Sequence, residues 1–287
     1  MNLPGLVDFH CHSTASDGSL APAQLVEAAA AQGIGLMALT DHDTVAGLAP
    51  ARAKAQELGI GWIDGIELSA KFAGGHLHIL GYGFDPTHPG LLAGLSAFRQ
   101  ARKNRLTKIL DKLSHCGLPL EEADLDLSEG TSPGRPHIAA AMVAKEYVKD
   151  QNQAFDEYLG HQGKAYADKE IFGPQETIAL IKNAGGLAVV AHPISLYLKR
   201  SELADYLEYL KGLGLDGIEA YNSSHQNDQC NRLVKIAAQL DLLVTGGSDF
   251  HGTAKPLVQL GRLKKGRKIL SKWISPQFFD TLGIETT

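Results

Sequence analysis

Cysteine is scarce in this chain of 287 residues, which contains only Cys11, Cys116 and Cys230. An odd number of scattered cysteines does not form a disulfide framework, and this usage favours a reducing compartment. The chain also lacks an apolar run of the roughly 20 residues that span a bilayer, and its first residues show no secretory signal pattern. We therefore expect a cytoplasmic protein without a membrane partner.

An excess of positive charge is missing too, because 27 Lys and Arg residues stand against 32 Asp and Glu residues. Aromatic residues make up 7% of the chain, and they do not interleave with basic residues into a track for long single strands. We therefore expect no stable complex with DNA, although a local basic pocket remains compatible with this composition.

Apolar segments alternate with amphipathic ones along most of the chain. The predicted strands cover residues 6–12, 34–39, 60–67, 75–82, 187–191, 217–221 and 242–245. The predicted helices cover residues 22–31, 44–58, 91–115, 174–183, 202–213 and 228–240. This rhythm predicts an α/β fold of parallel strands joined by right-handed crossovers, arranged either as an open doubly wound sheet or as a closed barrel.

The first strand ends in the sequence Asp8-Phe9-His10-Cys11-His12, with Asp17 close behind. Side chains alternate along a strand, so His10 and His12 share one face and Cys11 points away from them into packing. Two imidazoles with a nearby carboxylate form a compact unit of nitrogen and oxygen metal ligands. Asp8 is expected either to orient one of these ligands or only to end the strand.

Further polar residues follow the ends of other predicted strands. They are His42, Glu67, His78, His192, Asp249 and His251. In a parallel barrel the carboxyl ends of all strands converge on one mouth, whereas in an open sheet they spread along an edge. This distribution therefore favours a barrel. Asp43, beside His42, is expected either to cap the following helix or to belong to the site.

The strand-and-helix rhythm is interrupted in the middle of the chain. Residues 91–115 predict one long amphipathic helix, and the chain up to about residue 169 is mostly helical in pattern. We divide the chain into a barrel of residues 1–98 and 170–287 and a helical insertion of residues 99–169 that acts as a lid. The basic residues from Arg99 to Arg105 are interpreted as a solvated helix face.

Together these motifs resemble the PHP (polymerase and histidinol phosphatase) family. The resemblance is carried, in order, by Asp8-x-His10-x-His12, Thr40-Asp41-His42, Gly65-Ile66-Glu67, His78, Ala191-His192-Pro193 and Ser248-Asp249-x-His251. It implies a distorted seven-stranded β/α barrel with a trinuclear metal site. It also implies three ligand sets: His10, His12, Glu67 and Asp249; Asp17, His42 and His251; and Glu67, His78 and His192.

Bound cations would relieve the cost of clustering so many imidazoles and carboxylates. We expect two or three divalent ions, with Mn²⁺ as the first choice and Mg²⁺, Fe²⁺ and Zn²⁺ as alternatives. Asp17 adds a hard oxygen ligand to the second set, which favours Mn²⁺, Mg²⁺ or Fe²⁺ over Zn²⁺ there. Such ions clamp a phosphoryl group and make hydroxide available for in-line attack near neutral pH. The expected protein is therefore a metal-dependent phosphoesterase.

The insertion contains the segment Gly134-Arg135-Pro136-His137, and a second segment places Lys164 after Gly163. Both segments resemble a PHP subgroup that acts on nucleotides, which implies that Arg135 and Lys164 bind a substrate phosphate. Solvated charges are the alternative for both residues. His225 is expected to lie at the mouth, where it contacts substrate or protonates the leaving oxygen, with an ordinary loop histidine as the alternative.

The subgroup implies hydrolysis of the 3′-phosphate of nucleoside 3′,5′-bisphosphates, and it includes relatives that trim short 5′-phosphorylated RNA as a second activity. The predicted catalytic residues are Asp17, Arg135 and His225, and the predicted substrate-binding residues are Arg135, Lys164 and His225. A histidinol-phosphate phosphatase shares the barrel and metals, but the insertion argues against it. A non-catalytic metal-binding module is a third alternative, and the complete ligand set argues against that.

Overall fold

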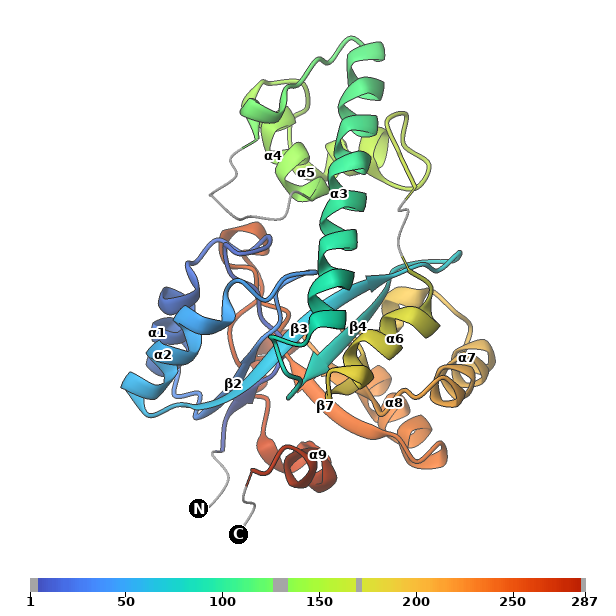
Figure 1. Cartoon of the computed structure of the whole chain (residues 1–287). Coiled ribbons are helices and arrows are strands. Elements are labelled where there is room, and N and C mark those ends of the chain that lie inside the picture. The colour runs from blue at the N-terminus through green and yellow to red at the C-terminus, as the bar shows by residue number, and fades with distance from the viewer. Residues whose placement is uncertain (1–4, 126–133, 169–171, 285–287) are drawn as a thin grey trace.

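A computed structural model describes residues 5–125, 134–168 and 172–284 (Figure 1). The lower part of the view is a barrel surrounded by helices, and the upper part is a small helical unit. The long helix α3, Pro89–His115, joins the two parts. The chain is therefore arranged as a strand-based body with a helical insertion above it.

The seven-stranded sheet follows the order of the chain, from β1 to β7. Its strands are β1 Val7–Asp8, β2 Leu36–Leu39, β3 Gly61–Ala70, β4 Leu77–Tyr82, β5 Leu187–Val190, β6 Gly217–Asn222 and β7 Leu243–Gly247. The first and last strands are also linked, because Phe9 N–H donates to Gly246 O at 3.2 Å and Asp249 N–H donates to His10 O at 2.7 Å. The sheet is therefore a nearly closed barrel, as predicted.

One strand runs against the predicted direction. Strand β4 is antiparallel to both β3 and β5, so the expectation of a wholly parallel sheet was wrong. The connection from β3 to β4 is short and contains no helix, which allows only an antiparallel neighbour. As a result His78, near the start of β4 rather than at its carboxyl end, still lies at the same mouth as the other polar residues.

Helices cover the outside of the barrel. The α-helices are α1 Pro22–Ala31, α2 Leu48–Leu58, α3, α4 Arg135–Ala144, α5 Gln151–Ala154, α6 Pro174–Asn183, α7 Arg200–Gly212, α8 Asn227–Gln239 and α9 Pro276–Thr281. Helices α1 and α2 lie on one side in Figure 1, and α6, α7 and α8 lie on the other. The bounds predicted for α1 and α6 are confirmed, since a proline at the first helical position and a left-handed glycine beyond the end bound each one.

The barrel interior is closed at its lower end by aromatic side chains. Phe278 and Phe279, from α9, pack against Phe9 of the first strand segment with ring centroids 5.3 and 6.2 Å apart. Tyr82 packs edge-on against Phe278 at 5.3 Å, and its hydroxyl donates to Phe9 O at 2.8 Å. With this end filled, the polar residues at the opposite end form the floor of an open mouth.

Helix α3 contributes to two separate hydrophobic clusters. Leu91, Leu95 and Phe98 belong to the cluster between the sheet and its outer helices, whereas Leu106 and Leu113 belong to the cluster of the insertion. The predicted domain boundary at residues 98 and 99 thus falls within a continuous helix, and the second boundary, at residues 169 and 170, lies outside the described residues. The helix fixes the insertion to the barrel because both cores hold it.

No helix in the described ranges is both long enough and apolar enough to cross a bilayer.

Candidate metal centre

The chain leaves β1 directly into the polar mouth. His10 and His12 are fully buried, and their Nε2 atoms are 3.1 Å apart. Cys11 points the other way, with Sγ 3.1 Å from Ala38 O within the hydrophobic core, as the strand period predicts. This short segment therefore places two imidazoles side by side in the centre of the mouth.

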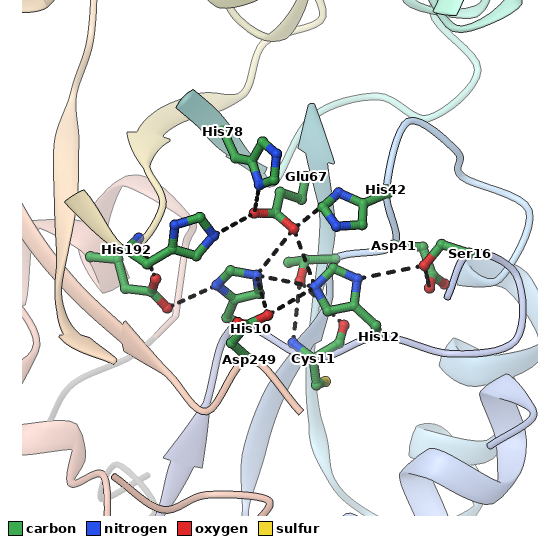
Figure 2. A network of polar contacts seen from close by, with 12 residues as sticks. His10, Cys11, His12, Ser16, Asp41, His42, Glu67, His78, His192 and Asp249 are labelled. Atoms are coloured by element: carbon green, nitrogen blue, oxygen red, sulfur yellow. Dashed lines mark hydrogen bonds and ion pairs between the residues drawn. The ribbon is translucent and has the colours of Figure 1, made fainter. Parts of the chain in front are cut away.

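The Glu67 carboxylate, on β3, lies in the middle of five histidines (Figure 2). Oε1 is 2.9 Å from His78 Nδ1 and 3.1 Å from His192 Nε2. Oε2 is 3.1 to 3.3 Å from Nδ1 of His42 and from Nε2 of His10 and His12. One buried carboxylate thus connects ligands from four parts of the barrel.

A second group adjoins the first through His12. Asp17 Oδ1 is 3.3 Å from His251 Nε2, and Asp17 Oδ2 is 3.8 Å from His42 Nε2. The Asp249 carboxylate lies between them and the centre, with Oδ1 3.5 Å from Nε2 of both His10 and His12. The structure therefore brings all nine predicted metal ligands into one cluster.

Three subsets of this cluster have the proximity that a shared cation requires. Within each subset the ligand atoms lie within 4.8 Å of one another. The subsets are His12, Asp17, His42 and His251; His10, His12 and Glu67; and His42, Glu67 and His78. They overlap the sets implied by the family resemblance, with His12 and His42 shared between neighbours.

The donor atoms fit cations better than they fit one another. Glu67 Oε2 and His42 Nδ1 are 3.1 Å apart and buried, yet neither has a hydrogen-bond partner within the described chain. Unsatisfied buried polar atoms are costly, and mixed imidazole and carboxylate ligands suit Mn²⁺, Fe²⁺ and Zn²⁺. The cluster is therefore able to hold metal ions.

The ionisable groups of the cluster perturb each other strongly. Burial opposes ionisation of Glu67, but the charges of His42 and His10 outweigh it and hold the pKa of Glu67 well below its usual range. Burial also disfavours the His12 imidazolium, whereas the adjacent carboxylates of Asp249 and Glu67 raise the pKa of His12 to about 9. Carboxylates charged at neutral pH are what cations require of their ligands.

A second layer of side chains orients the ligands. Glu219, on β6, is fully buried and accepts a hydrogen bond from His10 Nδ1 at 3.0 Å, which leaves Nε2 free to coordinate. Its other oxygen accepts from the backbone N–H of His192 at 2.8 Å. The sequence analysis missed Glu219, although one charged residue within the apolar segment 217–221 was the available signal.

Two aspartates of the motifs also belong to this layer. Asp41 accepts hydrogen bonds from the hydroxyls of Ser13 and Ser16, each at 2.6 Å, and so holds the loop before Asp17. Asp8 accepts from Ser248 Oγ at 2.6 Å and thereby ties the first strand to the loop that carries Asp249. Both carboxylates thus fix loops that carry predicted metal ligands.

Three residues beside the cluster have left-handed backbone conformations. These are Asp43, His192 and Asp249, with φ of 53°, 30° and 57°. Each follows the end of a strand, and such conformations in non-glycine residues cost about 1–3 kcal/mol each. Backbone strain of this kind is typical of positions where the fold must orient particular side chains, and here it orients two predicted metal ligands, His192 and Asp249.

A pocket of about 260 Å³ lies between the cluster and the insertion. Its barrel side includes Asp17, His42, His78 and His251, and its other side is built from α3, α4 and Phe155. Lys255 also lines it and pairs with Asp249 at 2.6 Å. The described residues therefore form one continuous space from the metal cluster to the underside of the insertion.

The predicted substrate residues are placed differently from one another. Arg135 lines the pocket, whereas Lys164 is exposed, does not line it, and lies with Nζ 5.3 Å from the centre of the Tyr158 ring. Residues 131–133 of the segment before Arg135 lie outside the described residues. Of the two cations expected to bind phosphate, the structure thus brings only Arg135 to the pocket beside the cluster.

His225 is buried rather than at the mouth. Its Nδ1 lies 3.1 Å from Ala220 O, it is 1% exposed, and it is not among the residues that line the pocket. Burial lowers the pKa of His225 to about 4, so the imidazole is neutral at pH 7. The described contacts therefore give no support to the predicted role of His225 as a proton donor at the mouth.

The basic residues of α3 are not all solvated, contrary to the expectation from the sequence. Arg102 and Arg105 line the pocket and are half-buried, so the expectation of a solvated helix face holds only for exposed members such as Arg99. Asp43 does not cap α2, whose first residue is Leu48. Its carboxylate instead pairs with Arg102.

The barrel, the cluster and the adjoining pocket define a phosphoesterase with ligands for metal ions. The chain belongs to the PHP domain family, whose model matches residues 8–208. A 5′-3′ exoribonuclease from Haemophilus influenzae is 38% identical over 245 residues, which cover 85% of this chain and 89% of that protein. A 3′,5′-nucleoside bisphosphate phosphatase from Chromobacterium violaceum is 33% identical over 247 residues, 85% of this chain and 87% of the relative.

A solved structure from Chromobacterium violaceum shares the fold. It is described as an amidohydrolase with bound sulfate and no metal, and it matches with a TM-score of 0.83 and 31% identity over 91% of this chain and 93% of that one. The named relatives are enzymes that cleave phosphate esters, so this chain is an enzyme of the same class and the alternative of a non-catalytic module is not supported.

Proposed function

We propose that the protein hydrolyses the 3′-phosphate of nucleoside 3′,5′-bisphosphates and releases a nucleoside 5′-monophosphate and inorganic phosphate. The observation that supports this proposal is one pocket that joins the cluster of nine predicted metal ligands to Arg135. A bisphosphate offers one phosphate to each end of such a pocket. The relative named as a nucleoside bisphosphate phosphatase supports the same substrate.

The cluster would hold two or three divalent ions, with Mn²⁺ the preferred ion. We propose three ligand sets: His10, His12, Glu67 and Asp249; Asp17, His42 and His251; and Glu67, His78 and His192. Bound there, such ions supply a water nucleophile at neutral pH and neutralise charge on the phosphoryl oxygens.

The chain's own residues would position the reacting ester. Glu219 holds the His10 ring by its Nδ1, and Asp41 holds the loop of Asp17, so the ligands are fixed before substrate arrives. Arg135 binds phosphate in the part of the pocket beneath the insertion, where apolar side chains exclude water and strengthen the charge interaction. This leaves the 3′-ester at the metal end.

A phosphate-release panel with Mn²⁺ tests the proposal. Its substrates are adenosine 3′,5′-bisphosphate, AMP, histidinol phosphate and a 5′-phosphorylated oligonucleotide. We expect the bisphosphate to give the largest kcat/KM, and a chelator to abolish the activity. A preference for histidinol phosphate, or bisphosphate hydrolysis that persists in protein shown by elemental analysis to be free of metal, would overturn it.

Trimming of short 5′-phosphorylated RNA is a second candidate, because the Haemophilus relative is named as a 5′-3′ exoribonuclease. The same pocket would take the terminal nucleotide. Release of mononucleotides from the oligonucleotide in the panel, at a kcat/KM above that for the bisphosphate, would favour this function over the first.

A further inference from the structure

We propose that residues 262–272, called the basic segment below, form a surface that binds the phosphodiester backbone of RNA at the end of the barrel opposite to the metal cluster. The choice of RNA rests on the second candidate function above. The surface itself is argued from the charges, the contacts and the position of this segment, and its partner is a polymer rather than the small substrate of the pocket.

The basic segment contains six cationic residues and no acidic one. The cationic residues are Arg262, Lys264, Lys265, Arg267, Lys268 and Lys272. The chain as a whole has a net charge of −5, so a segment with a charge of +6 runs against its overall balance. Positive charge gathered at one place on an acidic protein directs a polyanion to that place.

A tight turn presents the lysines of this segment to solvent. Arg262 and Lys268 pair in an isolated antiparallel bridge, which brings the two sides of the turn together. Lys265 and Gly266 at its tip have left-handed conformations, with φ of 59° and 74°. The backbone therefore holds several ammonium groups close to one another. The exposed lysines of the turn are Lys264, Lys265 and Lys268.

The two arginines of the turn are fixed by neighbouring groups. Arg262 Nη1 donates to Gly266 O at 3.1 Å and so closes the turn from one side. The guanidinium carbon of Arg267 lies 4.8 Å from the centre of the Trp273 ring, and this ring stacks on Tyr221 of β6 at 5.1 Å. The turn is thus attached to the barrel, and its cations are held in place before any partner binds.

The charges of the basic segment are not neutralised within the described chain. None of its six cations lies within ion-pair distance of a carboxylate of the described residues. By contrast, Lys145, Lys199 and Lys211 lie 2.7, 3.9 and 3.8 Å from carboxylate oxygens. Six unpaired cations on one short segment repel each other, and a row of phosphates relieves this repulsion.

The basic segment lies away from the pocket. Leu263 and Ile269, within it, belong to the same hydrophobic cluster as Phe278 at the closed end of the barrel. Val7, at the start of β1, donates its backbone N–H to Ile269 O at 3.1 Å, whereas the other end of β1 leads into the metal cluster. Helix α9 marks this closed end in Figure 1, on the far side of the barrel from the insertion.

The surroundings of the segment favour a nucleic-acid backbone over an acidic protein. Stable protein interfaces are centred on apolar or aromatic side chains that become buried, whereas contacts to phosphate groups dominate nucleic-acid binding. The large apolar side chains that the described residues expose all lie outside the basic segment. They are Leu58, Leu92, Tyr197, Tyr209 and Leu257.

The test measures binding of a fluorescent RNA of about 30 nucleotides, with EDTA present to stop hydrolysis. It compares the wild type with the triple variant Lys264→Gln, Lys265→Gln and Lys268→Gln. Each phosphate contact adds about 0.7 to the slope of log Kd against log salt concentration for a single strand. Loss of three contacts should therefore lower the slope by about 2 and weaken binding about 100-fold at about 0.1 M salt.

A second triple variant separates local contacts from net charge. Lys145→Gln, Lys199→Gln and Lys211→Gln remove the same total charge from lysines that already lie beside carboxylates. This control should keep the slope of the wild type and bind RNA with nearly the same Kd. Equal losses in the two triple variants, or no loss in the first, would overturn the surface. Equal Tm values for all three proteins check that each variant is folded.

Other polyanions test the choice of partner. Tighter binding of poly-glutamate, of phosphatidylglycerol vesicles or of single-stranded DNA of the same sequence than of the RNA would contradict the assignment to RNA. Trimming activity is measured separately with Mn²⁺ present. If the RNA binds as expected but is not trimmed, the second candidate function is wrong and the surface stands. If the RNA is trimmed but both proteins bind it equally, the surface is wrong and that function stands.

Discussion

Replacement of Glu67 by glutamine should uncouple this protein from its metal ions with little change in shape. Glu67 Oε2 lies 3.1 to 3.3 Å from the nitrogens of three imidazoles, and Oε1 lies within 3.1 Å of two more. In Glu67→Gln one oxygen becomes an amide donor, which cannot coordinate a cation, and the negative charge is lost. If this carboxylate is shared between ions, as proposed above, the single change weakens the binding of more than one ion.

The magnitude follows from mass action. Mn²⁺ at 100 times its Kd stabilises the wild type by about 2.7 kcal/mol, which corresponds to a rise in Tm of about 5–10 °C for a chain of this size. If Glu67→Gln weakens binding 100-fold, the same Mn²⁺ concentration leaves about 0.4 kcal/mol, or a rise of about 1 °C. Thermal unfolding with and without Mn²⁺ measures the difference.

Two further variants sharpen the comparison. Glu219→Gln makes the same chemical change in the residue that accepts a hydrogen bond from His10. If this variant binds Mn²⁺ tenfold more weakly, the Mn²⁺-dependent rise in Tm should still be about 3–6 °C. Glu57→Gln, on the exposed side of α2, should behave as the wild type. A full Mn²⁺-dependent rise in Glu67→Gln would refute the view that this carboxylate bridges ions.

Three other outcomes follow from the described contacts. Since the pKa of His12 is raised to about 9, metal-free protein carries that proton at pH 7, so Mn²⁺ binding should release protons and tighten as pH rises toward 9; calorimetric heats that do not vary with buffer ionisation enthalpy would contradict this. Phe278→Ala empties the closed end of the barrel and should lower the free energy of unfolding by about 3–5 kcal/mol in urea, with a smaller loss arguing that α9 is not part of the core. The pKa of His225 is lowered to about 4 by burial, so the unfolded chain binds this proton more readily and stability should fall as pH drops from 6.5 toward 4, by about 2 kcal/mol at pH 5; the same fall in His225→Phe would show that other groups cause it.

The ligand motifs could be predicted from the sequence because they depend on local geometry. Side-chain alternation along a strand places His10 and His12 together and turns Cys11 away, whatever the rest of the chain does. The bounds of α1 and α6 follow from proline and glycine at their ends. The convergence of distant polar residues followed from the rule that strand ends meet at one mouth of a barrel.

The direction of β4 and the contacts of individual charged residues depended on tertiary structure. Lys164 and Arg102 are both basic residues of the insertion segment, yet Lys164 is exposed whereas Arg102 lines the pocket and pairs with Asp43. His225 follows a strand as His192 does, but its ring turns into the core. Contacts across such long sequence separations arise only from packing, because neighbouring residues do not encode which surface a side chain will meet.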